Sequence, residues 1–354
     1  MIRWREGQVT ATSDPGAAIT LRVRTAGGEL DALAYPDVVG TPVVGDRVLL
    51  NTTALTLDLG TGGYALVVAI PDRLPADRDE PGHVVKARYT PLQTTVLGVD
   101  EQDSPHHPLL RDADDLDGMP VVVADLHSAL PAVLAGARAA GDQPQVAYVM
   151  SDGGALAIAF SRTVAGLREA GWLLASVTVG QAYGGDLEAV TVHTGLLAAR
   201  HVLGADLAIV TQGPGNLGTG TRWGFSGVAS GEVVNAVAAL GGRPVAALRI
   251  SEADARDRHR GVSHHSLTTL GRVALATADV AVPALEGAFG EGVRAQLAPL
   301  SPPHVLVPVA LDGLYDAIAA APVTVSSMGR GLAQDPAYFL ACAAAGRHAA
   351  TLVR

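Results

Sequence analysis

From about residue 120 to the C-terminus, the sequence repeats one pattern: a short apolar run, a polar or glycine-rich loop and a helical stretch. The apolar runs are continuous rather than alternating, as in strands that are buried on both faces of a sheet. Strands that alternate with helices form parallel βαβ units. The pattern therefore predicts an α/β domain over residues 120–354 with a mostly parallel, Rossmann-like sheet. We expect its strands at residues 120–124, 146–150, 173–179, 207–211, 245–250, 280–283, 305–307 and 323–326, and its helices at residues 129–140, 155–170, 187–203, 228–240, 267–276 and 336–345.

The first 85 residues have a different pattern. Short β-rich runs are separated by turns, which predicts a small β-barrel or sandwich domain over residues 1–85. Few aromatic side chains and few cations are present here, so we interpret this domain as a structural or oligomerisation module rather than a nucleic-acid-binding barrel. Residues 86–119 are predicted to be a linker and connecting segment. The β-rich runs cover residues 8–12, 18–25, 29–35, 47–51 and 63–70.

The composition of the 354-residue chain excludes several classes of protein. The formal net charge of -10 argues against non-specific binding of nucleic acid, which requires many cationic contacts. Lys86 is the single lysine, so a Walker A loop is absent. The single cysteine, Cys342, excludes an intrachain disulfide and a cysteine-based metal cluster.

The same composition predicts where the protein works. The N-terminal stretch has no apolar signal core, and no stretch approaches ~18 consecutive apolar residues, so we expect a cytoplasmic protein with no membrane contact. Aromatic residues make up 4% of the chain, so Ala, Val, Leu and Ile must build the core. A core of small residues often continues into a subunit interface, and we therefore expect a homo-oligomer.

Polar residues concentrate in the loops that follow the predicted strands. In open parallel sheets, ligands bind at the carboxyl ends of the strands, so we expect the functional site in these loops. Carboxylate and imidazole groups in such loops are candidates for acid–base chemistry. The predicted catalytic residues are Asp152 after the second strand, Glu188 and His193 on the helix expected after the third, and His264 and His265 after the fifth.

The loop that follows the fourth predicted strand carries four glycines. Glycines allow positive φ and close approach to a ligand, and successive amides near a helix start form an anion site. The spacing G-P-G-N-L-G fits the dinucleotide fingerprint formally, but it does not follow the first strand of the unit, and no acidic residue ends a strand about 20 residues on. We therefore predict an anion-binding loop, formed by Gly213, Gly215, Asn216, Gly218, Thr219, Gly220 and Thr221.

The loop after the fifth predicted strand, residues 251–266, is rich in arginine and histidine. Three of the chain's 11 histidines fall within seven residues, at positions 259, 264 and 265. Paired histidines ligate metals or move protons. Arginine forks suit phosphate or carboxylate, so we expect this loop to bind an anion through Arg256, Arg258 and Arg260.

Asp125 and His127 are spaced as in the sites that hold a divalent metal in metallophosphatases. The resemblance to that superfamily is partial, because Leu217 stands where a histidine is required and there is no Gly-His-x-His segment. A divalent metal held outside that pattern stays open. Its predicted ligands are Asp125, His127 and Asp186, and Glu188 and His264 are further candidates.

Several stretches taken together resemble a bacterial family known only as domain of unknown function 3866. The resemblance is essentially full length, and it implies no established activity, substrate or catalytic residue. The stretches that carry it are MSDGGA at residues 150–155, GGDLEA at 184–189, GPGNLGTGTRWGFSG at 213–227, RIS at 249–251, RHRGVSHH at 258–265 and SMGRG at 327–331.

Together these features predict an enzyme that acts on a small anionic metabolite, phosphorylated compounds included, by hydrolysis or group transfer, with a divalent metal as an open option. A nucleophilic Ser151 or Ser251 paired with His264 also stays open, although no G-x-S-x-G elbow is present. The alternative is a non-catalytic metabolite-binding or regulatory module whose β-domain contacts a partner. A catalyst needs a titratable group with a perturbed pKa beside the anion pocket, whereas a sensor needs only hydrogen-bond donors.

Overall fold

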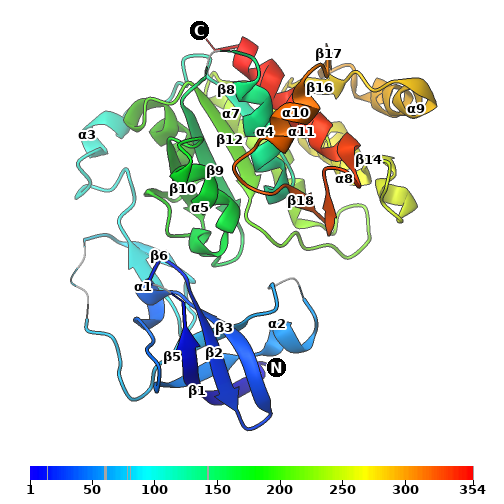
Figure 1. Ribbon diagram of the computed structural model, residues 1–354. Coiled ribbons are helices and arrows are strands. Elements are labelled where there is room, and N and C mark those ends of the chain that lie inside the picture. Colours follow the sequence, from blue (N-terminus) through cyan, green and yellow to red (C-terminus); the bar gives the residue numbers. More distant parts are fainter. Residues whose placement is uncertain (14, 60–61, 78, 80, 142, 354) are drawn as a thin grey trace. The chain divides into compact units, whose positions relative to one another are not determined.

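The computed structural model describes residues 1–13, 15–59, 62–77, 79, 81–141 and 143–353. The chain forms two compact units (Figure 1). One contains residues 1–81 and 85–96, and the other contains residues 82–84 and 97–354. Among the described helices, none has both the length and the apolar character needed to span a bilayer.

The first unit is a closed β-barrel, as the N-terminal sequence predicts. Its strands follow the order β1-β2-β3-β5-β4, and β4 pairs with β1 to close it. Alternate side chains such as Val23, Val48 and Leu50 are fully buried and fill the interior. The strands are β1 (Trp4–Thr12), β2 (Ile19–Thr25), β3 (Gly28–Ala34), β4 (Arg47–Asn51) and β5 (Ala65–Ala69), with two short helices, α1 (Pro36–Val39) and α2 (Thr53–Thr56).

Carboxylates neutralise several arginines of the barrel. Arg47 contacts Asp72 at 2.7 Å, and Arg73 contacts Asp46 at 2.6 Å. Arg22 lies 2.9 Å from Asp31. Each of these pairs neutralises an arginine that could otherwise contact a phosphate.

The second unit is built on an eight-stranded, all-parallel sheet, which confirms the predicted α/β class. Its order is β11-β10-β9-β12-β8-β13-β16-β17. The strands are β8 (Pro120–Val123), β9 (Val146–Asp152), β10 (Ala175–Gly180), β11 (Leu187–Ala189), β12 (Leu207–Gln212), β13 (Arg243–Ala246), β16 (Asp279–Pro283) and β17 (Val305–Val309).

Helices cover both faces of this sheet, and each face has its own apolar core (Figure 1). Val121 and Val123 of β8 pack with one set of helices, while Val122 packs with the other. This alternation is why the strands are apolar at every position. One core contains α6 (Val192–Leu197), α7 (Ser230–Ala239) and α9 (Gly287–Leu297), and the other contains α4 (Leu130–Arg138), α5 (Arg162–Glu169), α10 (Leu314–Ala319) and α11 (Pro336–Thr351).

Shorter elements complete the two units. The helix α3 (His107–Leu110) precedes the sheet, and α8 (His264–Thr268) runs into a π-helical turn at Thr269–Val273. Three two-stranded sheets lie outside the main one. They pair β6 (Val84–Lys86) with β7 (Thr94–Val96), β14 (Ile250–Ser251) with β15 (Gly261–Val262), and β18 (Ser326–Ser327) with β19 (Arg330–Gly331).

Three predicted elements are wrong in part. The helix expected at residues 155–170 begins only at Arg162, after a 3-10 turn at Ile158–Phe160 and a cap at Ser161. The helix expected at residues 187–203 begins only at Val192, because Leu187–Ala189 pairs with β10 as the edge strand β11. Glu188 therefore lies on a strand rather than on a helix. The strand expected at residues 323–326 does not join the main sheet; Ser326–Ser327 forms the β18–β19 hairpin instead.

Helices α4 and α11 touch at backbone distance, and two glycines make this contact possible. A Cβ added at Gly136 would meet the carbonyl of Ala343, and one added at Gly346 would meet the carbonyl of Val133, both far closer than real Cβ contacts. Alanines fill most of the remaining interface. The small side chains that dominate the composition thus serve close helix packing.

We expect Gly346→Ala to lower the free energy of unfolding by about 1–3 kcal/mol, because the two backbones must separate to admit a methyl group. The measurement is the midpoint of urea denaturation. A matched control is Gly292→Ala on α9, where an added Cβ meets nothing within 4 Å. There the higher helix propensity of alanine should stabilise the protein by about 0.5–1 kcal/mol. Equal midpoints for the two variants would contradict the close packing.

Candidate functional site

The candidate site lies at the carboxyl ends of the central strands. The chain leaves β8 toward β9 and leaves β12 toward β13, so two neighbouring strands send their connections in opposite directions along the sheet. Such a switch point is where open α/β sheets bind ligands. Asp125 follows β8, Gln212 ends β12 and Arg249 follows β13, and the Gln212 amide donates to the Asp125 carbonyl at 2.6 Å.

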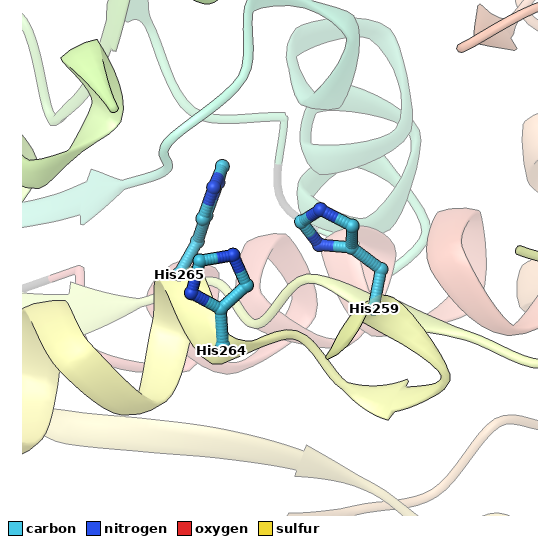
Figure 2. Close-up of side chains that lie close together, drawn as sticks. All are labelled: His259, His264 and His265. Carbon is cyan, nitrogen blue, oxygen red and sulfur yellow. The ribbon is translucent and has the colours of Figure 1, made fainter. Parts of the chain in front are cut away.

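Three histidine rings gather here in one cluster (Figure 2). One ring nitrogen from each of His259, His264 and His265 lies within 4.8 Å of the other two. The ring centroids are 4.5 to 5.0 Å apart. His259 and His265 are buried, and His264 is partly buried.

Local structure explains why these rings converge. The β14–β15 hairpin folds residues 250–262 back on themselves, and a 3-10 turn at Asp257–His259 directs His259 toward the start of α8. Ser263 caps α8 by accepting the backbone N–H of His265 at 3.2 Å, and its hydroxyl also lies 2.7 Å from His259 Nδ1. Phe225 stacks on the His265 ring at 3.8 Å with an interplanar angle of 5°. Ser263 therefore orients the His259 ring, and Phe225 orients the His265 ring.

A buried ion pair adjoins the cluster. Asp125 and Arg249 are 8% and 4% exposed, and Asp125 Oδ2 lies 3.9 Å from Arg249 Nη1. Both groups face His265 Nδ1, Arg249 at 3.2 Å and Asp125 at 3.4 Å. Asp125 Oδ2 makes no hydrogen bond within the described part of the chain. Its nearest polar partners are thus a permanent cation and an imidazole.

Burial keeps two of the clustered rings, His259 and His264, neutral. Desolvation, followed by the charge of Arg249, lowers the pKa of His259 to about 3. Desolvation, followed by the neighbouring His265, lowers the pKa of His264 to about 4, and the charge of Arg258 lowers it further. Near pH 7 both rings therefore keep a nitrogen lone pair that can accept a proton donor or bind a metal.

The glycine-rich loop forms one wall of the site. Thr219 N–H donates to the Gly224 carbonyl at 2.7 Å, so the loop closes into a small hairpin that leads to Phe225. The Asn216 side-chain oxygen accepts from Gln212, Ser226 and Gly227, which anchors the loop to β12. Gly215 and Gly220 have φ of 99° and 79°, which a residue with a Cβ adopts only with strain.

Several polar groups of this loop bond within it. The Thr219 and Thr221 hydroxyls lie 3.1 Å apart, and Thr221 also accepts the Gly224 N–H. Among the described residues, no carboxylate pairs with Arg258, whose guanidinium lies over Gly220: an added Cβ there would come within 3.9 Å of Nη2. Arg258 is therefore available to bind an anion beside the glycine-rich loop.

The predicted arginines thus separate into different roles. Arg256 is held by Asp254, with contacts of 2.8 and 2.9 Å, and these contacts lower the pKa of the carboxyl group strongly. Arg330 joins Asp254 at 3.2 Å and Asp335 at 3.0 Å, which fastens the β18–β19 hairpin to the loop. Asp335 also accepts the Ser251 hydroxyl at 2.6 Å, so Ser251 is bonded away from the histidines. Arg260 is exposed.

The remaining predicted residues lie apart from the cluster. Asp186 accepts from Arg168 and from Ser176, so it holds the chain beside the edge of β10. Glu188 is buried on β11 and accepts the Gly184 N–H at 2.5 Å. His193 is exposed on α6. The structure does not bring these three to the switch point.

His127 belongs to a separate buried network. Its Nδ1 lies 2.8 Å from the Tyr148 hydroxyl and its Nε2 lies 2.7 Å from the Ser161 hydroxyl. Tyr148 in turn contacts the Thr211 hydroxyl at 2.9 Å. Both ring nitrogens are occupied, so His127 does not point a free nitrogen at a metal beside Asp125. Burial lowers its pKa to about 4.

Asp152 lies at the base of the glycine-rich loop. It accepts the Gly154 N–H at 2.7 Å, and an added Cβ on Gly213 would come within 3.2 Å of its Oδ2. Burial raises its pKa, and hydrogen bonds from the Gly154 and Gly213 backbone oppose the rise. Of the predicted carboxylates, it is the one placed against the predicted anion loop.

Sequence reasoning missed three residues of the site. His259 was named with the arginine- and histidine-rich loop but not among the catalytic or metal-binding residues. The signal for it was present: three histidines in seven residues on either side of a turn. No sequence pattern indicates Arg249 or Phe225. Arg249 is a single arginine at the end of a predicted strand, and Phe225 is a single aromatic residue of the kind that cores contain.

The chain belongs to the family described as protein of unknown function (DUF3866), whose pattern matches residues 31–346. This confirms the resemblance carried by the glycine-rich and histidine-rich stretches. A comparison with curated proteins found no match.

The His127 network predicts a pH dependence of stability. The pKa of His127 is about 4 in the folded protein and about 6.5 when exposed. Between these pH values the ring is protonated in the unfolded chain but not in the folded protein. The free energy of unfolding should fall as the pH drops from 6.5 toward 4, by about 3 kcal/mol from this group, and its contribution should level off below pH 4. His127→Gln should flatten the slope in that window. Urea denaturation at a series of pH values measures it, and an unchanged slope in the variant would contradict the assignment.

Proposed function

We propose that this protein is an enzyme that hydrolyses, or transfers a group from, a small anionic metabolite. The observation that carries the proposal is the position of Arg258. Its guanidinium is exposed and lies between Gly220 of the glycine-rich loop and the histidine cluster, with no carboxylate partner among the described residues. An arginine in this position is suited to a phosphate or carboxylate, because its planar fork offers two parallel donors.

The neighbouring groups support catalysis over simple binding. An anion receptor needs only donors such as Arg258 and the loop amides. Here the receptor adjoins three imidazoles, two of which have a strongly lowered pKa, and a half-buried Asp152 with a raised pKa lies at the base of the same loop. Perturbed groups gathered in one place are typical of active sites. In this proposal Arg258 holds the anion, and Asp152 handles the proton that moves between the attacking and leaving groups.

The test is the response of anionic and neutral substrates to Arg258→Ala. We expect the wild-type protein to turn over a chromogenic phosphoester, and the variant to show a KM for it about 10- to 100-fold higher, since a hydrogen bond to a charged group contributes about 1.5–3 kcal/mol. Cleavage of a neutral carboxylic ester should change little. The matched control is Arg272→Ala, an exposed arginine on the turn after α8.

The outcomes separate the two candidate functions. Binding of inorganic phosphate that Arg258→Ala weakens, without turnover of any ester, would favour the non-catalytic metabolite-binding module. Equal effects of Arg258→Ala and Arg272→Ala would remove Arg258 from the site and overturn the proposal.

A further inference from the structure

The three clustered histidines come from one short segment but offer their nitrogens to one point in space. His264 Nε2 is buried and, among the described residues, has no hydrogen-bond partner. His259 has its Nδ1 occupied by the Ser263 hydroxyl, which leaves Nε2 for another contact. A buried nitrogen without a hydrogen-bond partner lowers the stability of the folded state. Such an atom in a polar cluster indicates a bound ion or another ligand.

The group has the donor set of a metal site. Neutral imidazole suits zinc, copper, iron and nickel, and it binds a metal only when it is deprotonated. In the described part of the chain, no fourth His, Cys, Asp or Glu joins the group, so three protein ligands would leave one position open. Three protein ligands with an open position is the arrangement of catalytic zinc sites.

The spacing is compatible with such a metal after a small movement. Zinc binds imidazole at about 2.0–2.1 Å in tetrahedral geometry, which places the ligand nitrogens about 3.4 Å apart. The three nitrogens now lie within 4.8 Å of one another, so each must move inward by at most about 0.8 Å.

Asp125 supplies the outer support that metal-binding histidines require. A histidine that binds a metal through one nitrogen donates its other N–H to a carboxylate or carbonyl. Asp125 Oδ2 lies 3.4 Å from His265 Nδ1 and makes no hydrogen bond within the described residues. Arg249 Nη1 lies 3.2 Å from the same nitrogen and can only donate, so Nδ1 accepts from Arg249 in this structure. The contact with Asp125 requires the tautomer of His265 that carries its proton on Nδ1. The positive charge of Arg249 opposes a metal cation, and the Asp125 carboxylate offsets it.

We propose that His259, His264 and His265 bind one divalent transition metal, best fitted by Zn²⁺, and that Asp125 orients His265 from outside the coordination sphere. Of the ligands that the sequence predicts, this set keeps His264 and omits His127 and Asp186, because these two are bonded elsewhere. The metal deepens the proposed function, since an open position beside Arg258 would take a water molecule or an oxygen of the anionic substrate. The site itself rests on the histidines alone.

The test reads the metal directly. The full-length protein is stripped with a chelator, dialysed against Zn²⁺ or Co²⁺, and analysed by mass spectrometry for metal per chain. We expect one equivalent in the wild-type protein, a visible spectrum of tetrahedral Co²⁺, and a rise in melting temperature with Zn²⁺. His264→Ala and His259→Ala should lose the metal, the spectrum and the rise in melting temperature.

Controls separate ligation from folding. His193→Ala removes an exposed histidine on α6 and should retain one equivalent. Because His264 makes no hydrogen bond within the described residues, His264→Ala should keep the melting temperature of the stripped wild-type protein. Asp125→Asn should weaken Zn²⁺ binding about 10- to 100-fold without abolishing it.

Contrary results are equally definite. A metal content below one tenth of an equivalent in the reloaded wild type, or full retention by His264→Ala, would overturn the site. Complete loss in Asp125→Asn would overturn the outer role of that residue. The proposed function fails separately, through the kinetics of Arg258→Ala, so a metal site with no ester turnover would refute the substrate class and leave the metal assignment intact.

Discussion

The arrangement of the site depends on one buried charge, the guanidinium of Arg249. A cation inside a protein must be balanced, and among the described residues Asp125 is the only carboxylate within 4.0 Å of it. These residues follow β13 and β8, which are neighbours in the sheet, so the pair ties two strand ends together. Burial is the main cause of the lowered pKa of His259 and His264, and the charge of Arg249 adds to it. The buried guanidinium thus fixes the position of Asp125 and helps to keep these two rings neutral.

The architecture followed from the sequence wherever burial decides the pattern. Strands such as β12 and β16 are covered on both faces, so their residues are apolar without interruption and their positions could be predicted. The edge strand β11 could not, because its three residues include Glu188 and run directly into a helix. The short apolar run before the hairpin β18–β19 predicts a strand of the main sheet, which the structure does not contain. In both cases tertiary pairing, which the local pattern does not encode, decided the outcome.

The sequence predicts where the site lies, but not which residues form it. The rule that ligands bind at the carboxyl ends of parallel strands led to the loops after β8, β9, β12 and β13. It gave no means of telling which polar side chains in those loops turn toward one another. His127 turns into the core to meet Tyr148, while Arg256 is taken up by Asp254. The residue type shows which ligand or proton a side chain could bind. Its hydrogen-bond and ion-pair partners in the fold decide whether it is available to do so.

Phe225 has a consequence for how the two glycine- and histidine-rich segments behave together. Its ring lies flat against His265 at 3.8 Å, and the hairpin that ends at Phe225 carries Gly220 beneath Arg258. A ligand that draws the loop toward it would therefore also pull on the imidazole through this stacked ring. The stacked ring thus joins the glycine-rich hairpin and the histidine cluster by direct contact, and neither segment can shift without changing that contact.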